Sequence, residues 1–163
     1  MIRPATPEDL SRILEIFDSA RAFMHSHGNP SQWTNGYPDQ SAVLGDIASG
    51  AAYVLYDSES VYGAFSLFTR PDPCYARIFE GAWPNDAPYV TIHRIASDGT
   101  HRGVVQEAVN FALRLCPHVR VDTHKNNLPM QKALKAIGFQ YCGVILLQKP
   151  DDPERLAFQL DAE

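Results

Sequence analysis

The sequence predicts one α/β domain, with a mixed, mostly antiparallel sheet flanked by about four helices. Apolar residues recur at helical spacing in three stretches, at 10–24, 104–116 and 130–137. The β-branched and aromatic runs 51–56 and 61–68 are joined by four polar residues, which is typical of a β-hairpin. One helical stretch separates the strand-like runs 89–96 and 118–123, so a right-handed crossover should make them parallel.

The first third of the chain predicts a short strand and two helices. Residues 2–5 are extended, and the motif Thr6-Pro7-Glu8-Asp9 favours a helix start through a capping Thr, Pro at the first helical position and early acids. The helix should run to about His25. A loop, 28–38, then leads to a weaker helix, 40–49.

The remaining elements follow from terminators and alternating patterns. Residues 75–80 are a further candidate strand, and Pro117 should stop the helix that begins at Val104. Asn126 or Asn127 can cap the next helix, which Gly138 terminates. The last two strands are predicted at 139–148 and 155–160.

The size and charge of the chain exclude several classes of partner. Its 163 residues fit a single domain, 1–163, and the net charge of −5 gives no reason to expect nucleic acid or an anionic membrane as partner. No apolar run is long enough to span a bilayer, and the N-terminus lacks the apolar core of a signal peptide. Three widely spaced cysteines suit a reducing compartment. We therefore expect a cytoplasmic protein.

The stretch 89–116 is the most informative part of the sequence. A strand passes through a polar turn, Ser97 to Gly103, directly into a helix. The free N–H groups of a first helical turn and the helix dipole both favour an anion at such a place. The sequence thus predicts an anion-binding helix N-terminus at Val104.

With these motifs in order, the chain resembles the GNAT superfamily of N-acetyltransferases over nearly its whole length. Ile92-His93-Arg94-Ile95-Ala96-Ser97 is similar to the central strand of that family, and Asp98 to Gln106 to its acyl-CoA pyrophosphate loop. Asn127, eleven residues before Gly138-Phe139, is similar to the asparagine and closing Gly-Phe of its next helix. The resemblance implies the fold above, with the parallel pair of strands splayed apart.

The resemblance also implies a co-substrate, acetyl-CoA, and the residues that hold it. A bulge in the central strand would aim backbone N–H groups of residues 95–97 at the thioester carbonyl. The implied acetyl-CoA-binding residues are Ile95, Ala96, Ser97, His101, Arg102, Gly103, Val104, Val105, Gln106 and Asn127. Without the resemblance, the turn residues among them read as an exposed polar turn and Asn127 as a helix cap.

Three residues depart from the family pattern. Val105 stands where glycine is usual, and Glu107 where glycine or alanine is usual. Leu134 occupies the place where many members have a tyrosine that protonates the departing thiolate. These departures favour the alternative function, a non-catalytic member of the fold that binds acyl-CoA or a partner.

Amine acetylation needs a base, and His93 is the first candidate. It precedes the expected bulge, and imidazole suits proton transfer near neutral pH. Glu80 is the second candidate, acting through water. The competing interpretations are a structural histidine bonded inside the sheet and a solvated acid.

The acceptor is predicted to be a small molecule with a primary amine, attacked directly in a ternary complex. Aromatic residues in or beside loops are candidate substrate-binding residues; they are Trp33, Tyr37, Trp83 and Tyr89. Each of them alone is also compatible with ordinary packing. No group of residues has the spacing of a metal site. The acceptor's identity and the oligomeric state, a homodimer included, are left open.

Overall fold

The computed structural model describes residues 1–163. The helices and strands follow one another along the chain in this order: β1 (Ile2–Pro4), α1 (Leu10–Ser26), α2 (Gln40–Ala48), β2 (Ala52–Tyr56), β3 (Val61–Phe68), β4 (Val90–Ser97), α3 (Val104–Leu113), β5 (His118–Thr123), α4 (Leu128–Ile137), β6 (Gln140–Leu146) and β7 (Glu154–Asp161). None of the helices is long and apolar enough to cross a membrane.

The seven strands form one mixed sheet in the order β1-β2-β3-β4-β5-β7-β6. Every neighbouring pair is antiparallel except β4–β5, which confirms the predicted parallel pair. Only two residue pairs join these strands, Val90 with Val119 and Thr91 with Arg120. Beyond Thr91 the two strands splay apart. From Ile92 to Ser97, β4 therefore pairs only with β3, and its edge toward β5 faces an opening.

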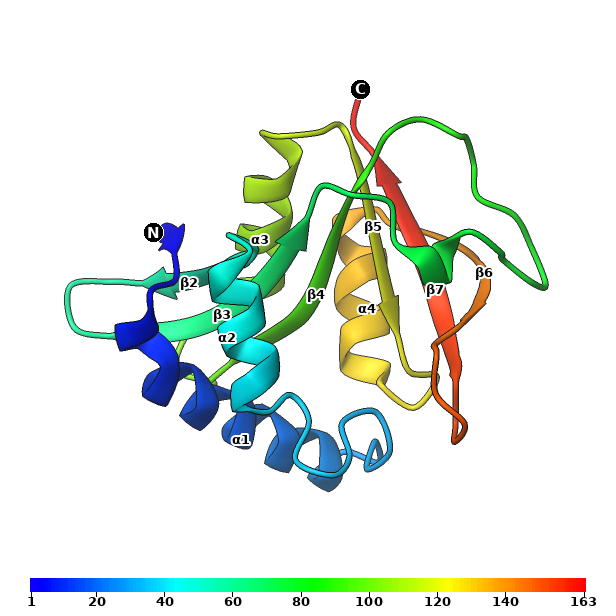
Figure 1. Cartoon of the computed structure of the whole chain (residues 1–163). Coiled ribbons are helices and arrows are strands. Elements are labelled where there is room, and N and C mark those ends of the chain that lie inside the picture. The colour runs from blue at the N-terminus through cyan, green and yellow to red at the C-terminus, as the bar shows by residue number, and fades with distance from the viewer.

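Helices cover both faces of the sheet and enclose two cores (Figure 1). α1 and α2 pack on one face, where Ile16 and Phe17 of α1 and Val54 of β2 are fully or nearly fully buried. α3 and α4 pack on the other face over a larger core that includes Phe65 and Leu134. The connection 69–89 (green) passes over the part of the sheet made by β5, β7 and β6.

Two expectations about element boundaries were wrong. Residues 75–80 form no strand; only Phe79 makes an isolated bridge, to Val144, because a 3₁₀ helix at 73–75 turns the chain. The 104–116 helix ends at Leu113, since its last N–H groups bond into a tight turn before Pro117. The helix start predicted at Thr6-Pro7 is confirmed: Thr6 is the N-cap of a 3₁₀ turn over 7–9, which continues directly into α1 at Leu10.

Candidate active site

A β-bulge in β4 lies at the point where the sheet opens. Ala64 of β3 pairs with Ala96 and Ser66 pairs with His93, so Phe65 faces the two residues Arg94 and Ile95. Arg94 has a φ of 51°, a left-handed conformation that non-glycine residues adopt rarely. Successive residues of a regular strand point to opposite faces. The bulge breaks this alternation, and all four residues 92–95 line one cavity.

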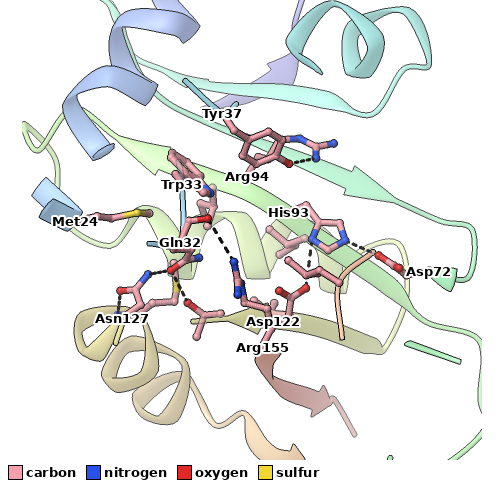
Figure 2. A pocket seen from close by; sticks show the side chains of 16 residues that line it. Met24, Gln32, Trp33, Tyr37, Asp72, His93, Arg94, Asp122, Asn127 and Arg155 are labelled. Atoms are coloured by element: carbon pink, nitrogen blue, oxygen red, sulfur yellow. Dashed lines mark hydrogen bonds and ion pairs between the residues drawn. The ribbon is translucent and has the colours of Figure 1, made fainter. Parts of the chain in front are cut away.

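This cavity, which we call the polar cavity, has a volume of about 230 Å³. Its walls come from the end of α1, the 28–38 loop, β4, β5, β7 and the start of α4. Figure 2 shows the side chains that line it. They are Met24, Gln32, Trp33, Tyr37, Asp72, Ile92, His93, Arg94, Ile95, Val121, Asp122, Thr123, Asn127, Met130, Leu147 and Arg155.

His93 lies between two carboxylates in the polar cavity. Its Nε2 is 2.7 Å from Asp72 Oδ2, and its Nδ1 is 3.6 Å from Asp122 Oδ2. The second distance exceeds hydrogen-bond length. A carboxylate accepts but does not donate, so Nε2 carries the hydrogen and the lone pair of the neutral ring is on Nδ1. That lone pair is available to a ligand.

Both carboxylates are held in place by further contacts. Burial raises the pKa of Asp72, but hydrogen bonds from His93 and from the Cys74 N–H outweigh it and leave this pKa below its ordinary value. Asp122 accepts a 2.6 Å hydrogen bond from the hydroxyl of Tyr75. Burial and the Asp122 charge raise the pKa of Tyr75 well above its ordinary value, so this phenol stays protonated and keeps donating. The cavity thus holds two fixed negative charges beside one imidazole.

A second cavity, the apolar cleft, begins where the polar cavity ends. Its volume is about 490 Å³, and four residues line both spaces, namely Met24, Ile95, Asn127 and Met130. The cleft runs between α1, the last residues of β4 and α4 as far as Val104 and Val105 at the start of α3. An elongated ligand can therefore reach from the N-terminus of α3 to the bulge beside His93.

The N-terminus of α3 has the features of an anion site. Gly103 precedes it with a φ of 76° and no atom within 4 Å of the place of a Cβ, so the backbone N–H groups are approachable. The exposed Arg102 makes no hydrogen bond or ion pair within the protein. A mainly apolar channel that ends at such a helix suits an elongated ligand with an anionic end.

Several solved structures that are similar to this chain are named as acetyltransferases. An acetyltransferase of the GNAT family from Streptococcus agalactiae matches all of this chain and 95% of its own, at 32% identity and a TM-score of 0.89. A GNAT-family acetyltransferase from Listeria monocytogenes shares the fold at 19% identity and a TM-score of 0.71; the match covers 99% of this chain and 94% of that one. An N-acetyltransferase from Staphylococcus aureus does so at 18% identity and a TM-score of 0.62, with 100% of this chain and 98% of that one covered. No protein-family model matches the sequence, and neither does any curated protein sequence.

The chain belongs to the GNAT family of acetyltransferases. The family fold predicted from the sequence, with its mixed sheet and splayed parallel pair, is confirmed. The match to the streptococcal protein covers the whole of this chain, so the GNAT fold accounts for all of residues 1–163.

This GNAT chain brings most of its sequence-predicted residues to the two cavities. His93, Trp33 and Tyr37 line the polar cavity. Residues 95–97 and Val104, Val105 and Asn127 line the apolar cleft. Asn127 also caps α4, accepting from the Met130 N–H, and donates to Gln32. Its two interpretations, helix cap and ligand contact, are therefore compatible.

The other seven predicted residues line neither cavity; Arg102 and Gly103 lie at the N-terminus of α3, and the rest are Glu80, Trp83, Tyr89, His101 and Gln106. Glu80 is exposed on the loop next to the Phe79–Val144 bridge and lines neither cavity, because residues 75–80 do not continue as a strand beside β4. Trp83 and Tyr89 enclose the Arg120 guanidinium, at 3.9 and 4.0 Å from the two ring centres, and so support the site from behind. Gln106 is exposed and bonds Asn110.

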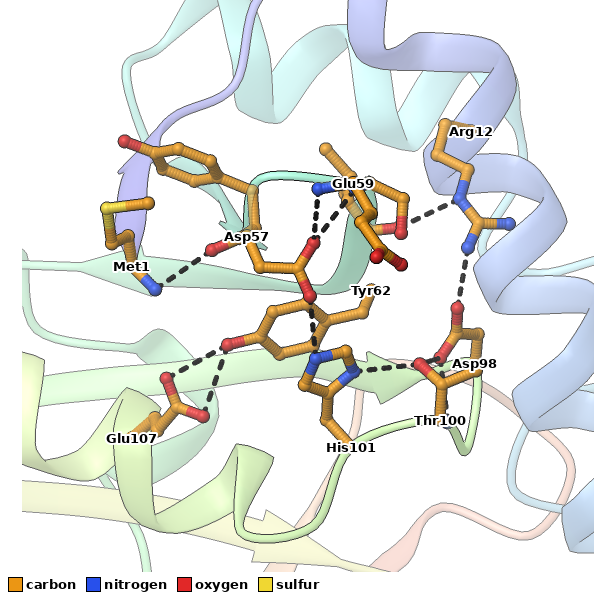
Figure 3. A network of polar contacts seen from close by, with 12 residues as sticks. Met1, Arg12, Asp57, Glu59, Tyr62, Asp98, Thr100, His101 and Glu107 are labelled. Atoms are coloured by element: carbon orange, nitrogen blue, oxygen red, sulfur yellow. Dashed lines mark hydrogen bonds and ion pairs between the residues drawn. The ribbon is translucent and has the colours of Figure 1, made fainter.

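His101 lines neither cavity and lies in a polar network with Asp57, Tyr62 and Thr100 (Figure 3). Its ring stacks on Tyr62 with 3.7 Å between centres, and its Nε2 lies 2.8 Å from Asp57 Oδ2. The Tyr62 hydroxyl in turn donates to Glu107 at 3.1 and 3.2 Å. The negative charge of Glu107, which departs from the GNAT pattern, is thus engaged by Tyr62. Leu134 is fully buried in the core and lines neither cavity.

Sequence reasoning gave Arg94 no role beyond the central strand, and it missed three further charged residues of this GNAT site, Asp72, Asp122 and Arg155. They come from a turn, from β5 and from β7, and only the fold brings them to His93. Arg155 carried a weak signal, since strand alternation places it with Ala157 and Gln159 on one face, a polar pattern that is unusual for a buried strand.

Proposed function

We propose that this acyltransferase is an N-acetyltransferase that transfers the acetyl group of acetyl-CoA to a primary amine of a small molecule. The observation that carries the proposal is the imidazole of His93, fixed by Asp72 at the bulge where the polar cavity meets the apolar cleft. A base, a polar space for an acceptor and a channel for a thioester arm meet at one point.

In this proposal His93 accepts the proton of the attacking amine. Asp72 holds the ring so that its Nδ1 lone pair is free, and it stabilises the imidazolium that forms. Asp122, 3.6 Å from Nδ1, attracts the ammonium form of the acceptor to the same place. A primary amine beside these two groups can hydrogen-bond both His93 Nδ1 and Asp122 Oδ2.

Acetyl-CoA supplies the electrophilic thioester carbonyl when it is bound. The residues proposed to hold it are 95–97, whose backbone faces the splay, and the first turn of α3 with Arg102 and Gly103. Backbone N–H groups aimed at a developing oxyanion typically contribute about 3 kcal/mol each to lowering a barrier. At the α3 N-terminus any non-proline residue likewise provides an N–H group, so Val105 in place of glycine keeps a backbone donor for the phosphate end.

Direct attack, without an acetylated enzyme, is the mechanism that the side chains favour. None of the three cysteines lines either cavity. Burial raises the pKa of both Cys74 and Cys142, which lowers their thiolate fraction. The departing thiol has an ordinary pKa near ~8.5, so water can supply its proton without an acid at Leu134. The three free cysteines suit the reducing cytoplasm as the place of this reaction.

The test separates catalysis from mere binding. Calorimetry should show acetyl-CoA binding to the wild type and to His93→Gln with similar affinity, while thiol release with an amine panel falls by about 10²-fold or more in the variant. Binding by the wild type without thiol release from any amine would instead favour the non-catalytic alternative. No binding at millimolar acetyl-CoA would contradict both.

A further inference from the structure

The polar cavity contains two guanidinium groups whose surroundings differ. Arg94 donates to both oxygens of Asp46, at 2.7 and 2.8 Å, and is neutralised by that carboxylate. Arg155 is not paired with any carboxylate. Its Nη1 donates to the backbone oxygens of Asp152 and Glu154, at 2.9 and 2.8 Å, and its Nη2 lies 3.5 Å from the backbone oxygen of Gln32.

An unpaired guanidinium is unusual at this depth. Arg155 is only 3% exposed, and burial lowers its pKa, although the charges of Asp122 and Asp152 oppose that shift. Taking a charge out of water without a partner is costly, so buried charges are normally paired. Its Nε donates to no group in the protein, and the side chain lines the polar cavity. The missing partner of Arg155 therefore belongs in the cavity.

The cavity is polarised in a way that defines a ligand. His93 and Asp122 provide a place for an ammonium group, while Arg155, which enters from β7, keeps Nε and Nη2 as a fork of N–H donors, because Nη1 bonds to backbone oxygens (Figure 2). A guanidinium fork matches a carboxylate in shape and charge. The volume of about 230 Å³ restricts the ligand to a small molecule.

We propose that the acceptor is an amino-acid-like zwitterion, whose amine faces His93 and whose carboxylate binds Arg155. This inference rests on the proposed function and narrows its acceptor class. Amines without a carboxylate cannot pair with Arg155, so they leave its guanidinium without a counter-charge and bind more weakly. Arg155 is then a specificity-determining residue, distinct from the base.

The test compares amino acids with their carboxamides, which lack only the negative charge. Thiol release is measured for glycine, alanine, β-alanine, γ-aminobutyrate and larger α-amino acids and for the matching amides, with kcat/KM corrected for the fraction of free amine. The variants are Arg155→Gln and Arg155→Lys, with Arg114→Gln as control, because Arg114 is exposed and lies outside both cavities. Melting temperatures establish that each variant is folded.

The expected result is a preference of about tenfold or more for the carboxylate member of at least one pair. It should disappear in Arg155→Gln, return in part in Arg155→Lys and persist in Arg114→Gln. Calorimetry gives a second readout that needs no turnover, since the preferred amino acid should bind the wild type and not Arg155→Gln. Equal rates within every pair, a preference that survives Arg155→Gln, or no reaction of any carboxylate member would overturn this inference. Absence of acetyl-CoA binding would instead contradict the proposed function itself.

Discussion

Replacing Asp72 by Asn tests whether His93 works as half of a hydrogen-bonded pair. In the wild type, Asp72 Oδ2 accepts the His93 Nε2 hydrogen at 2.7 Å, and Oδ1 accepts the Cys74 N–H at 2.8 Å. Asn keeps an oxygen for the Cys74 N–H, so the 73–75 turn should persist. Its amide offers His93 a donor instead of a charge, which favours the wrong tautomer and leaves the Nδ1 lone pair unavailable.

The expected loss follows from the contact that is removed. A hydrogen bond to a charged group is worth about 1.5–3 kcal/mol. If about 2 kcal/mol of this acts on the transition state, kcat falls about 30-fold, since about 1.4 kcal/mol is a factor of ten. The tautomer change adds to that loss. The dissociation constant of acetyl-CoA, whose proposed contacts lie in the apolar cleft, should stay within about twofold.

The chain offers a matched control for this substitution. His118 Nδ1 lies 2.7 Å from Asp161 Oδ1 at the far end of the sheet, outside both cavities. Asp161→Asn removes the same kind of pair and should leave kcat unchanged. The assay is thiol release at saturating acetyl-CoA, with circular dichroism melts of both variants. A folded Asp72→Asn enzyme with wild-type kcat would refute the assignment of Asp72 to the His93 ring.

Three further predictions concern the acetyl-CoA site, the core and the acid limb of stability. Arg102→Gln should weaken acetyl-CoA binding about fivefold by calorimetry, as expected for one exposed ion pair worth about 1 kcal/mol, and an unchanged affinity would contradict its role. Leu134→Ala should lower the free energy of unfolding in urea by about 2–5 kcal/mol, because Leu134 is fully buried; a loss below about 1 kcal/mol would contradict this. The Arg3 hydrogen bond lowers the pKa of Asp9, although burial opposes it, so Asp9 stabilises the fold above its unfolded pKa of about 3.9. That stability is lost as pH falls through the lower folded pKa, and Asp9→Asn should flatten the unfolding free energy below about pH 4; an unchanged acid slope would contradict it.

The fold was predictable because local signals and topology rules agree along this chain. The helical periodicity of 104–113 and its place between two strands were enough to give a right-handed crossover and a parallel pair. The expectation for 75–80 failed because a tertiary contact overrides propensity there. Tyr75 is buried, and its hydroxyl bonds Asp122 across the sheet, which fixes a turn where the residue types alone favour a strand.

The candidate site was only partly predictable, for a geometric reason. His93 and Asn127 lie in motifs whose spacing places them, whereas Asp72 and Arg155 are isolated charges, 21 residues before His93 and 28 residues after Asn127. Which acid meets His93 depends on how the 69–89 connection folds back over β5, and no local pattern encodes that path. Glu80, the carboxylate chosen from the sequence, belongs to the same connection but to its outer side.

The consequence of the β4 bulge could be stated from the sequence only as a family property. The structure adds its physical effect in this chain, which is to turn His93, Arg94 and Ile95 into one cavity. The same departure from alternation places Arg94 against Asp46 and leaves the neighbouring space to Arg155. The one-residue shift is not visible in the hydrophobic periodicity of β4, because Val90, Thr91 and Ile92 are buried in succession and leave no alternation for the bulge to interrupt.

The central claim is that His93 is the base for amine acetylation by acetyl-CoA. Its most direct test is the pH dependence of kcat/KM for the best amine, measured by thiol release in the wild type and in His93→Gln, alongside the NMR titration of the His93 ring. We predict that the wild-type rate rises over the same pH interval in which the ring loses its proton, and that this rise is missing in the variant. A variant with the wild-type profile and rate would contradict the claim.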